Sequence, residues 1–279
     1  MSIAVSVTNM KGGVGKTTVT ANLGHCLATL HDKKVLLVDV DPQFNLTQYC
    51  MNETDYEEIQ TDRTKGTVFN IFIPDRFPAP GPLAELKPKK KKEIKYIYKV
   101  RDNLFLIPSS IQLIDFIDQR KSGGERLLSK FIDSIKDTFD FVLIDCPPTS
   151  TILSRAAYLA SDGYLIPMGM DYFSVMGIPL LYKDINDFTE TYGKMMKGIG
   201  ILKTRYLDWT KVSQKHRDVV NDFSKKLKIK IFNASFTQRQ DVQNALSERE
   251  FIIEHKRNCQ SSREMQEITE EFLSETANI

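Results

Sequence analysis

The sequence of 279 residues predicts an α/β fold: a doubly wound, mostly parallel sheet with helices on both faces. Three observations support this class: the chain holds apolar runs of strand length, most of these runs are continuous, and segments with helical periodicity separate them. Continuous apolar runs are typical of strands buried on both faces of a parallel sheet. The predicted strands cover residues 3–7, 35–38, 104–107, 141–144, 164–168, 199–202 and 229–232.

The composition is that of an ordinary globular chain, with 41% hydrophobic and 27% charged residues. No run approaches the roughly 20 apolar residues of a membrane span, and the first residues show no basic segment leading into an apolar one. We therefore expect a cytoplasmic protein. The cysteines, Cys26, Cys50, Cys146 and Cys259, lack C-x-x-C spacing, so we interpret them as free thiols.

The whole chain, residues 1–279, is predicted to form one domain with an insertion or excursion from the sheet around 52–101. This stretch holds the turn-forming segment PDRFPAPGP and the basic segment KPKKKKEIK, without a clear core period. Its lysine run, Lys89 to Lys92, is either a solvated loop or a nucleic-acid contact, and the sequence leaves both interpretations open.

Residues 9–18, NMKGGVGKTT, match the second half of the phosphate-loop (P-loop) pattern G-x-x-x-x-G-K-[ST]. Met10 stands where the first glycine is expected, and a second lysine, Lys11, follows it. A strand precedes the loop and an amphipathic helix, predicted over 15–30, follows it, so free N–H groups at the helix start can bind phosphate. The predicted nucleotide contacts in the loop are Lys11, Gly12, Gly13, Val14, Gly15, Lys16, Thr17 and Thr18.

Two predicted strands end in aspartates. The stretch VLLVDVD gives Asp39 and Asp41, and FVLIDCPP gives Asp145. Ligands of open α/β sheets lie beyond the carboxyl ends of the strands, so these acids are expected to face the phosphates of ATP. Mg²⁺ is assigned to Thr17 and Asp145, and Asp41 is expected to orient a water on the γ-phosphate. Lys16 supplies a catalytic cation, and Asp39 is predicted to contact the nucleotide, with a structural role as the alternative.

The segments KGGVGKTT, VLLVDVDPQFNLT and FVLIDCPPT together resemble the three motifs of the ParA/Soj family of partition ATPases, a deviant Walker A group of P-loop NTPases that also contains MinD. The similarity extends to SREMQEITEEF near the end, whereas the stretch 52–101 departs from compact members. The resemblance implies an ATP- and Mg²⁺-dependent homodimer in which Lys11 reaches the nucleotide of the other subunit. It also implies that Asp41 is needed for hydrolysis, and that a ParB-like centromere-binding activator stimulates it.

Family members contact the adenine base after two late strands. The matching segments here are KTRYLD and NASFTQRQDV, which indicate Arg205 and Gln238 as base contacts. The iron–sulfur reductases that share this loop require paired cysteine ligands, and Cys146 alone does not supply them.

Relatives of the ParA type bind nonspecific DNA, whereas MinD-type relatives bind membranes through a basic terminal helix. Here the terminal helix is predicted to start at the capping box Ser261-Ser262-Arg263-Glu264 and carries an acidic face, which anionic lipid would repel. Residues 194–263 hold 16 Lys and Arg against 7 Asp and Glu, a balance of +9. We therefore expect nucleoid-associated DNA binding and no membrane contact; a MinD-like positioning ATPase for a membrane-associated or protein cargo is the alternative. The DNA-binding candidates are Lys225, Lys226, Arg257 and Arg263.

Overall fold

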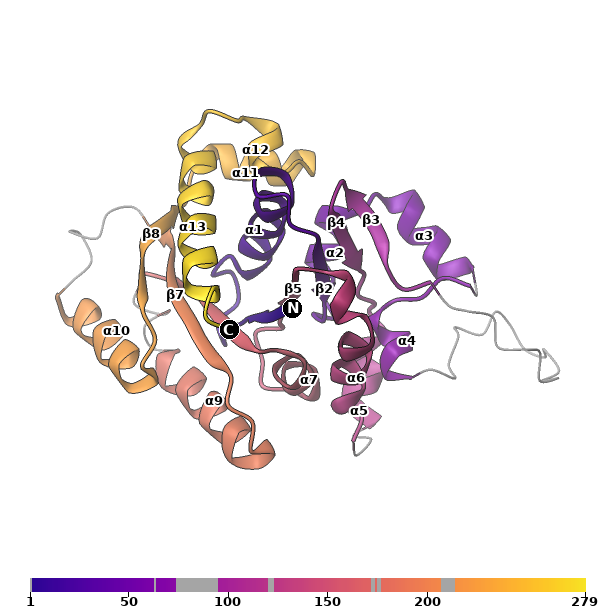
Figure 1. Cartoon of the computed structure of the whole chain (residues 1–279), viewed down its shortest axis with the longest axis horizontal. Helices are drawn as coiled ribbons and strands as arrows, with labels where there is room; N and C mark the ends of the chain where they lie inside the picture. Colours follow the sequence, from indigo (N-terminus) through magenta and orange to yellow (C-terminus); the bar gives the residue numbers. More distant parts are fainter. Residues whose placement is uncertain are drawn as a thin grey trace.

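The computed structural model describes residues 2–62, 64–73, 95–119, 123–171, 174, 177–206 and 214–279. Within these ranges the chain forms three layers, a central eight-stranded sheet with helices on both faces (Figure 1), which confirms the predicted fold class. The strands are β1 (Ile3–Val7), β2 (Val35–Asp39), β3 (Tyr98–Arg101), β4 (Leu104–Ile107), β5 (Phe141–Asp145), β6 (Gly163–Gly169), β7 (Lys197–Tyr206) and β8 (Ile231–Thr237).

The strand order is β3-β4-β2-β5-β1-β6-β7-β8, and every neighbouring pair is parallel except β3 with β4. The direction of winding reverses at β1, which lies between β5 and β6. In a doubly wound sheet the crevice at this reversal, beyond the carboxyl ends of the strands, is where ligands bind. The order therefore places the loop after β1 at the expected binding site.

Both edges of the sheet differ from the sequence-based prediction. The last strand begins at Ile231 rather than at 229, because the Ile229 N–H donates to Ser224 O and closes the turn that follows the preceding helix. It also continues past Phe232 through alternating polar residues, as an edge strand does. Strand β3 was not predicted, since its charged residues Lys99 and Arg101 interrupt any apolar run.

The helices divide between the two faces of the sheet. One face is covered by α1, α2, α11, α12 and α13, whose apolar residues join a single buried cluster with the strands. The other face is covered by α4 to α7, α9 and α10. The helix bounds are α1 (Lys16–Leu30), α2 (Asn45–Cys50), α3 (Glu53–Thr61), α4 (Val68–Phe72), α5 (Leu113–Gln119), α6 (Arg126–Ile135), α7 (Ile152–Ala160), α9 (Ile178–Tyr192), α10 (Gln214–Leu227), α11 (Gln240–Glu248), α12 (Ile252–His255) and α13 (Gln260–Thr276), with a 3₁₀ turn η1 (Lys136–Thr138).

The stretch 52–101 contains α3, α4 and β3 in its described parts. Helix α4 contributes Val68, Phe69 and Phe72 to the buried core, and a hydrogen bond from the Gly66 N–H to the Tyr98 hydroxyl ties the two ends of the stretch together. These described parts are therefore packed against the sheet. The lysine run Lys89 to Lys92 lies outside the described residues, and the extent of the insertion stays a prediction.

The terminal helix starts earlier than predicted, and the predicted capping box was wrong. Helix α13 begins at Gln260, and the Cys259 sulfur accepts the Ser262 N–H. Glu264 is buried rather than part of a cap, because its carboxylate accepts hydrogen bonds from the backbone N–H and hydroxyl of Thr237 at the end of β8. Among the described residues, no helix combines the length and apolarity needed to cross a bilayer.

Candidate nucleotide site

The loop between β1 and α1 forms the floor of a cavity of about 630 Å³. Gly13 and Gly15 have φ values of 72° and 86°, a left-handed conformation that glycine adopts without the strain of a side chain. This backbone turns the start of α1 toward the cavity, where free N–H groups and the helix dipole favour phosphate. The loop residues lining the cavity are Gly12, Gly13, Gly15, Lys16, Thr17 and Thr18.

Val14, like Lys11, is a predicted loop contact that does not line this cavity. Its side chain is buried at 2% exposure, and its carbonyl accepts a hydrogen bond of 2.7 Å from the Thr204 hydroxyl on β7. The contact fixes the loop to the sheet, so Val14 acts through its backbone.

The two lysines of the loop occupy different places. Lys16 is buried, and its Nζ donates to the Lys11 carbonyl at 3.1 Å, which keeps its charge inside the loop. Burial lowers the pKa of Lys16, while the carboxylates of Asp145 and Asp41 act to raise it. Lys11 instead points away from the loop: its Nζ donates to Asp171 Oδ1 at 2.7 Å and to Ser174 Oγ at 3.0 Å.

Thr17 and Asp145 meet below the loop, as predicted for a cation site. The Thr17 hydroxyl donates to Asp145 Oδ2 at 2.7 Å. Burial raises the pKa of Asp145 to about 7. The hydrogen bond from Thr17 and the charge of Lys16 act to lower this pKa, but burial has the larger effect. A hydroxyl and a carboxylate at this position are the two protein groups that hold Mg²⁺ in P-loop NTPases, so the pair fits the ion.

Asp41 lines the cavity across from the loop and is held in a fixed turn. Its Oδ1 accepts the Gln43 N–H at 2.9 Å, and its carbonyl accepts the Ser109 hydroxyl at 2.7 Å. Phe44 then has a φ of 44°, an uncommon left-handed value for a residue with a bulky side chain, and its ring stacks on Tyr56 of α3 at 5.7 Å between centroids. This arrangement positions the Asp41 carboxylate at the cavity.

The structure corrects the prediction that Asp39 contacts the nucleotide. It is fully buried and does not line the cavity; Oδ2 accepts both the N–H and the hydroxyl of Thr47 at 2.8 Å, and Oδ1 accepts the Asp41 N–H at 3.1 Å. Burial, reinforced by the charge of Asp145, raises the pKa of Asp39 well above its usual value. Asp39 therefore supports the turn to Asp41 and the first turn of α2 rather than touching a ligand.

Arg205 and Gln238, predicted from two segments distant in sequence, lie together. Arg205 Nε donates to Gln238 Oε1 at 3.3 Å, and an Arg205 terminal nitrogen donates to the Gly13 carbonyl at 2.8 Å. Both line a hollow of about 180 Å³ that shares Gly13, Thr18 and other wall residues with the phosphate cavity. The geometry can therefore place a base beside the phosphate loop.

Sequence reasoning missed several residues around the cavity. Asp171 follows the buried strand β6 by two residues, as Asp41 follows β2, so the same rule could have found it. Tyr49 and Arg249 also line the cavity, but they come from helix ends far apart in the chain, and no local pattern marks them.

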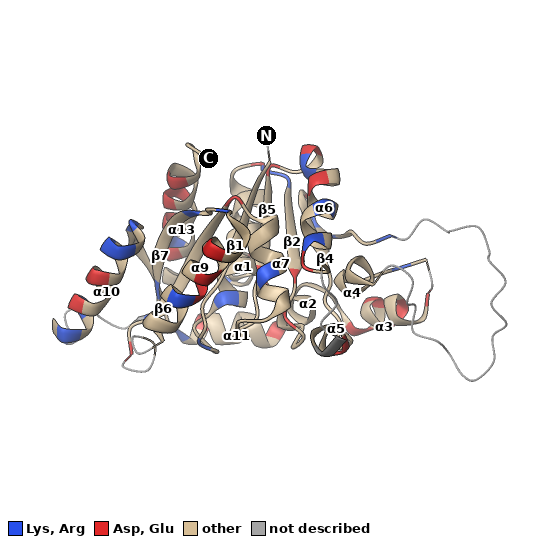
Figure 2. Cartoon of the chain, turned by 90° about the horizontal axis from the view of Figure 1, so that it is seen from below, with Lys and Arg blue, Asp and Glu red and all other residues tan. Residues whose placement is uncertain are grey.

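The four DNA-binding candidates form two separate pairs. Lys225 and Lys226 lie in the last turn of α10, just before β8 begins, whereas Arg263 lies in the first turn of α13, which contacts the end of β8. Arg257 lies in the connection between α12 and α13. All four are exposed, and Figure 2 shows basic residues at both ends of α10 with acidic residues between them.

Fold and cavity together define the class of P-loop nucleotide hydrolases. A family model described as an AAA domain matches residues 2–197. The chain is 30% identical over 273 residues to the chromosome-partitioning ATPase Soj of Treponema pallidum, covering 95% of each chain. It is also 32% identical over 192 residues to the sporulation initiation inhibitor protein Soj of Bacillus subtilis, covering 66% of this chain and 65% of that one. The chain belongs to the ParA/Soj family of partition ATPases and is an ATP hydrolase.

Solved structures show the same fold. The ATP complex of a single-substitution variant of Cyanothece McdA matches with a TM-score of 0.77 at 21% identity, covering 99% of this chain and 96% of that one. A putative plasmid partition protein from Borrelia burgdorferi bound to AMPPNP matches with a TM-score of 0.71 at 23% identity, covering 98% of both. Nucleotide and magnesium both occur in structures of this fold, the latter with ADP in cobyrinic acid a,c-diamide synthase from Mycobacterium smegmatis.

Proposed function

We propose that this chain is a ParA-type partition ATPase that dimerises on ATP, binds DNA without sequence preference, and hydrolyses ATP when a ParB-like centromere-binding protein stimulates it. The observation that carries the proposal is the outward position of Lys11. One buried lysine, Lys16, already lines the cavity, while Lys11 lies outside its lining and forms a partly exposed ion pair with Asp171. A partly exposed cation beside the phosphate loop can serve the nucleotide of a second protomer, which links ATP binding to dimerisation.

The buried groups have the roles expected of phosphoryl transfer, in which positioning and charge stabilisation dominate. Lys16 neutralises phosphate charge, and Thr17 with Asp145 would hold Mg²⁺, which supplies further charge neutralisation when bound. Asp41, fixed by the turn to Gln43, orients the attacking water. Arg205 and Gln238 bind the base at the neighbouring hollow.

DNA binding rests on exposed basic side chains. Lys225 and Lys226 are exposed at the end of α10, away from the acidic partners that neutralise Lys230, whose Nζ lies 2.9 Å from Glu271 and 2.8 Å from Glu275. Two protomers joined by ATP present two such surfaces, and the second contact becomes intramolecular. Such avidity raises affinity by roughly 10² to 10⁴ without a new contact. If the dimer binds DNA in this way, the protein associates with the nucleoid.

The terminal helix favours DNA over a membrane as the surface that the protein binds. Its apolar residues Met265, Ile268 and Phe272 are fully buried against the sheet, so they are not available to insert into lipid. Membrane-binding amphipathic helices require an exposed apolar face and a basic rim. Helix α13 has neither in this structure, since Glu267 and Glu270 are exposed on its other face.

The experiment that tests this function measures binding to random duplex DNA and to anionic liposomes side by side, with ATP or ADP present. We expect ATP-dependent DNA binding that ignores base sequence and weakens with salt, with a log–log slope of about −0.9 for each phosphate neutralised. Liposomes should not bind in either nucleotide state. ATP-dependent liposome binding without DNA binding would instead support a MinD-like positioning ATPase.

A further inference from the structure

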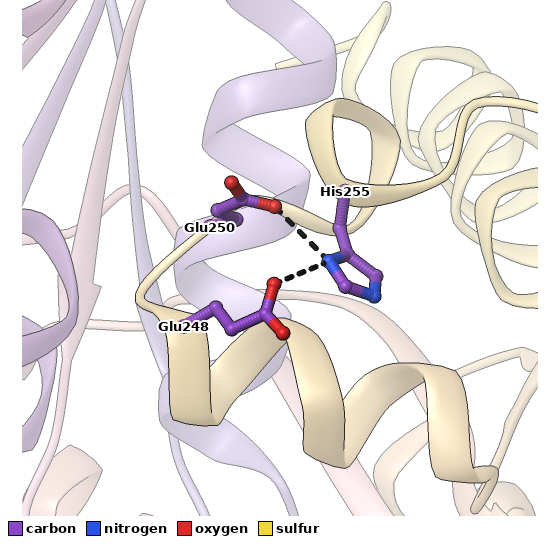
Figure 3. Close-up of side chains that lie close together, drawn as sticks. All are labelled: Glu248, Glu250 and His255. Carbon is purple, nitrogen blue, oxygen red and sulfur yellow. Dashed lines mark hydrogen bonds and ion pairs between the residues drawn. The ribbon is translucent and has the colours of Figure 1, made fainter.

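The end of α11, the turn that follows it and the end of α12 bring three potential metal ligands together. His255 Nδ1 lies 3.0 Å from Glu250 Oε2 and 3.2 Å from Glu248 Oε2. Figure 3 shows both carboxylates directed at this one ring nitrogen. One ligand atom from each of the three residues lies within 4.8 Å of the other two.

A cation at the centre of this arrangement would pair with both carboxylates at once. A single ring nitrogen offers at most one N–H, which can be donated fully to one carboxylate, whereas a metal ion binds all three groups together. Zn²⁺ lies about 2.0 to 2.2 Å from nitrogen and oxygen ligands, so tetrahedral ligand atoms stand roughly 3.3 Å apart. The two distances from His255 are close to this spacing.

The backbone holds the ligands in place before any ion binds. Arg249, between the two glutamates, has a φ of 55° and ends α11, which sets the directions of its two neighbours. The Glu250 N–H donates to Ala245 O at 2.9 Å, and the Tyr49 hydroxyl donates to the Glu250 carbonyl. A ligand set held on a fixed backbone loses little entropy when it binds a metal.

We propose that Glu248, Glu250 and His255 bind a divalent transition-metal ion of the Zn²⁺ type, at a site separate from Thr17 and Asp145. An imidazole ligand favours Zn²⁺ over Mg²⁺ and Ca²⁺, which prefer all-oxygen sites. The metal-site segment, residues 248–255, also reaches the nucleotide cavity, because Arg249 lines that cavity. Arg249 in turn pairs with Glu53 of α3 at 2.9 Å. A bound ion therefore holds Arg249 at the nucleotide.

The test is equilibrium dialysis of the nucleotide-free full chain against Zn²⁺, with a large excess of Mg²⁺ present and with the thermal unfolding midpoint as a second readout. The parent should bind one equivalent and unfold at a higher temperature, because an ion that binds only the folded state stabilises it. His255→Ala and Glu248→Gln should each weaken binding by about tenfold or more. His31→Ala and Glu267→Gln, which change the same residue types elsewhere, should bind like the parent.

Two results would overturn the site. The first is that the parent binds no Zn²⁺ under these conditions. The second is that the His255→Ala variant binds Zn²⁺ as tightly as the parent, which would mean that the ion binds at the thiols or elsewhere. Should His255→Ala lose its fold by circular dichroism, the exposed change Glu248→Gln decides the question. Because no nucleotide is present, the result does not depend on dimerisation or DNA binding.

Discussion

Lys11 Nζ lies 2.7 Å from Asp171 Oδ1 within one protomer, an ion pair between the phosphate loop and the end of β6. Although partial burial acts to raise it, hydrogen bonds from Lys11 and Ser174 hold the pKa of Asp171 down to about 2, so the Asp171 carboxylate is ionised at neutral pH. The two side chains are 31% and 50% exposed. Such a pair contributes no more than about 1 kcal/mol, so Lys11 can leave it for a partner's nucleotide at small cost.

The first prediction concerns this lysine. Lys11→Ala should still bind ATP, because Lys16 and the loop backbone remain, but it should stay monomeric with a nonhydrolysable ATP analogue. Size-exclusion chromatography with light scattering measures the masses of the parent and the variant with the analogue. The control is Lys130→Ala, an exposed change on α6, which should dimerise like the parent. A variant that dimerises like the parent would show that Lys11 serves only its own protomer.

The second prediction concerns Asp41. Asp41→Asn keeps an oxygen for the Gln43 N–H but removes the charge that orients water, so the turn should persist while hydrolysis fails. A group that acts only in the transition state lowers turnover rather than affinity. We expect phosphate release to fall at least about tenfold, with nucleotide affinity unchanged within about threefold. Phosphate release close to that of the parent would assign Asp41 to structure alone.

The third prediction concerns Asp145 and pH. Its folded pKa of about 7 lies above the ordinary value of 3.8, so the folded chain holds this proton more tightly than the unfolded chain. The resulting stabilisation is complete below about pH 4 and is lost as the pH rises through 7. Asp145→Asn should therefore stabilise the nucleotide-free protein more at pH 8 than at pH 5, by about 1 to 3 kcal/mol.

Urea unfolding at the two pH values, without Mg²⁺ or nucleotide, measures this difference. Asp133→Asn, an exposed change on α6, is the control and should show no such dependence. An equal effect of Asp145→Asn at both pH values would mean that the carboxyl titrates alike in the folded and unfolded chains.

Most of the sheet could be predicted because its central strands are continuous apolar runs, and such runs have few other uses in a globular chain. The edges were harder to predict. Strand β8 alternates polar and apolar residues, and β3 is short and charged, so tertiary pairing rather than local composition makes them strands. The start of α13 was misplaced because Glu264 fits a capping pattern, but its carboxylate binds Thr237 on a distant strand instead.

The phosphate loop could be predicted because its chemistry depends on residues that are adjacent in sequence. Thr17 and Asp145 are far apart, yet the rule that acids after buried strands face the ligand placed them correctly together. The same rule failed for Asp39, which is the last residue of β2 and faces Thr47. The contact between Lys11 and Asp171 required the strand order, which no local pattern reveals.

The last prediction asks which end of β8 meets DNA. The pair Lys225 and Lys226 and the pair Arg257 and Arg263 lie at opposite ends of this strand, so one flat contact is not expected to use both pairs equally. Changing both residues of one pair to glutamine should make the slope of log affinity against log salt concentration shallower. The expected change is about 0.9 for each phosphate that is no longer neutralised. Because exposed Glu267 lies one helical turn after Arg263 on α13 and offsets its charge, we expect the Lys225→Gln/Lys226→Gln variant to show the larger reduction. The control is Lys130→Gln/Lys183→Gln, which removes the same charge elsewhere on the surface. Light scattering should show that all of these variants still dimerise with ATP. Equal salt slopes for the parent and for both basic-pair variants would show that these residues do not contact DNA. That result would leave the proposal of an ATP-driven dimer unaffected.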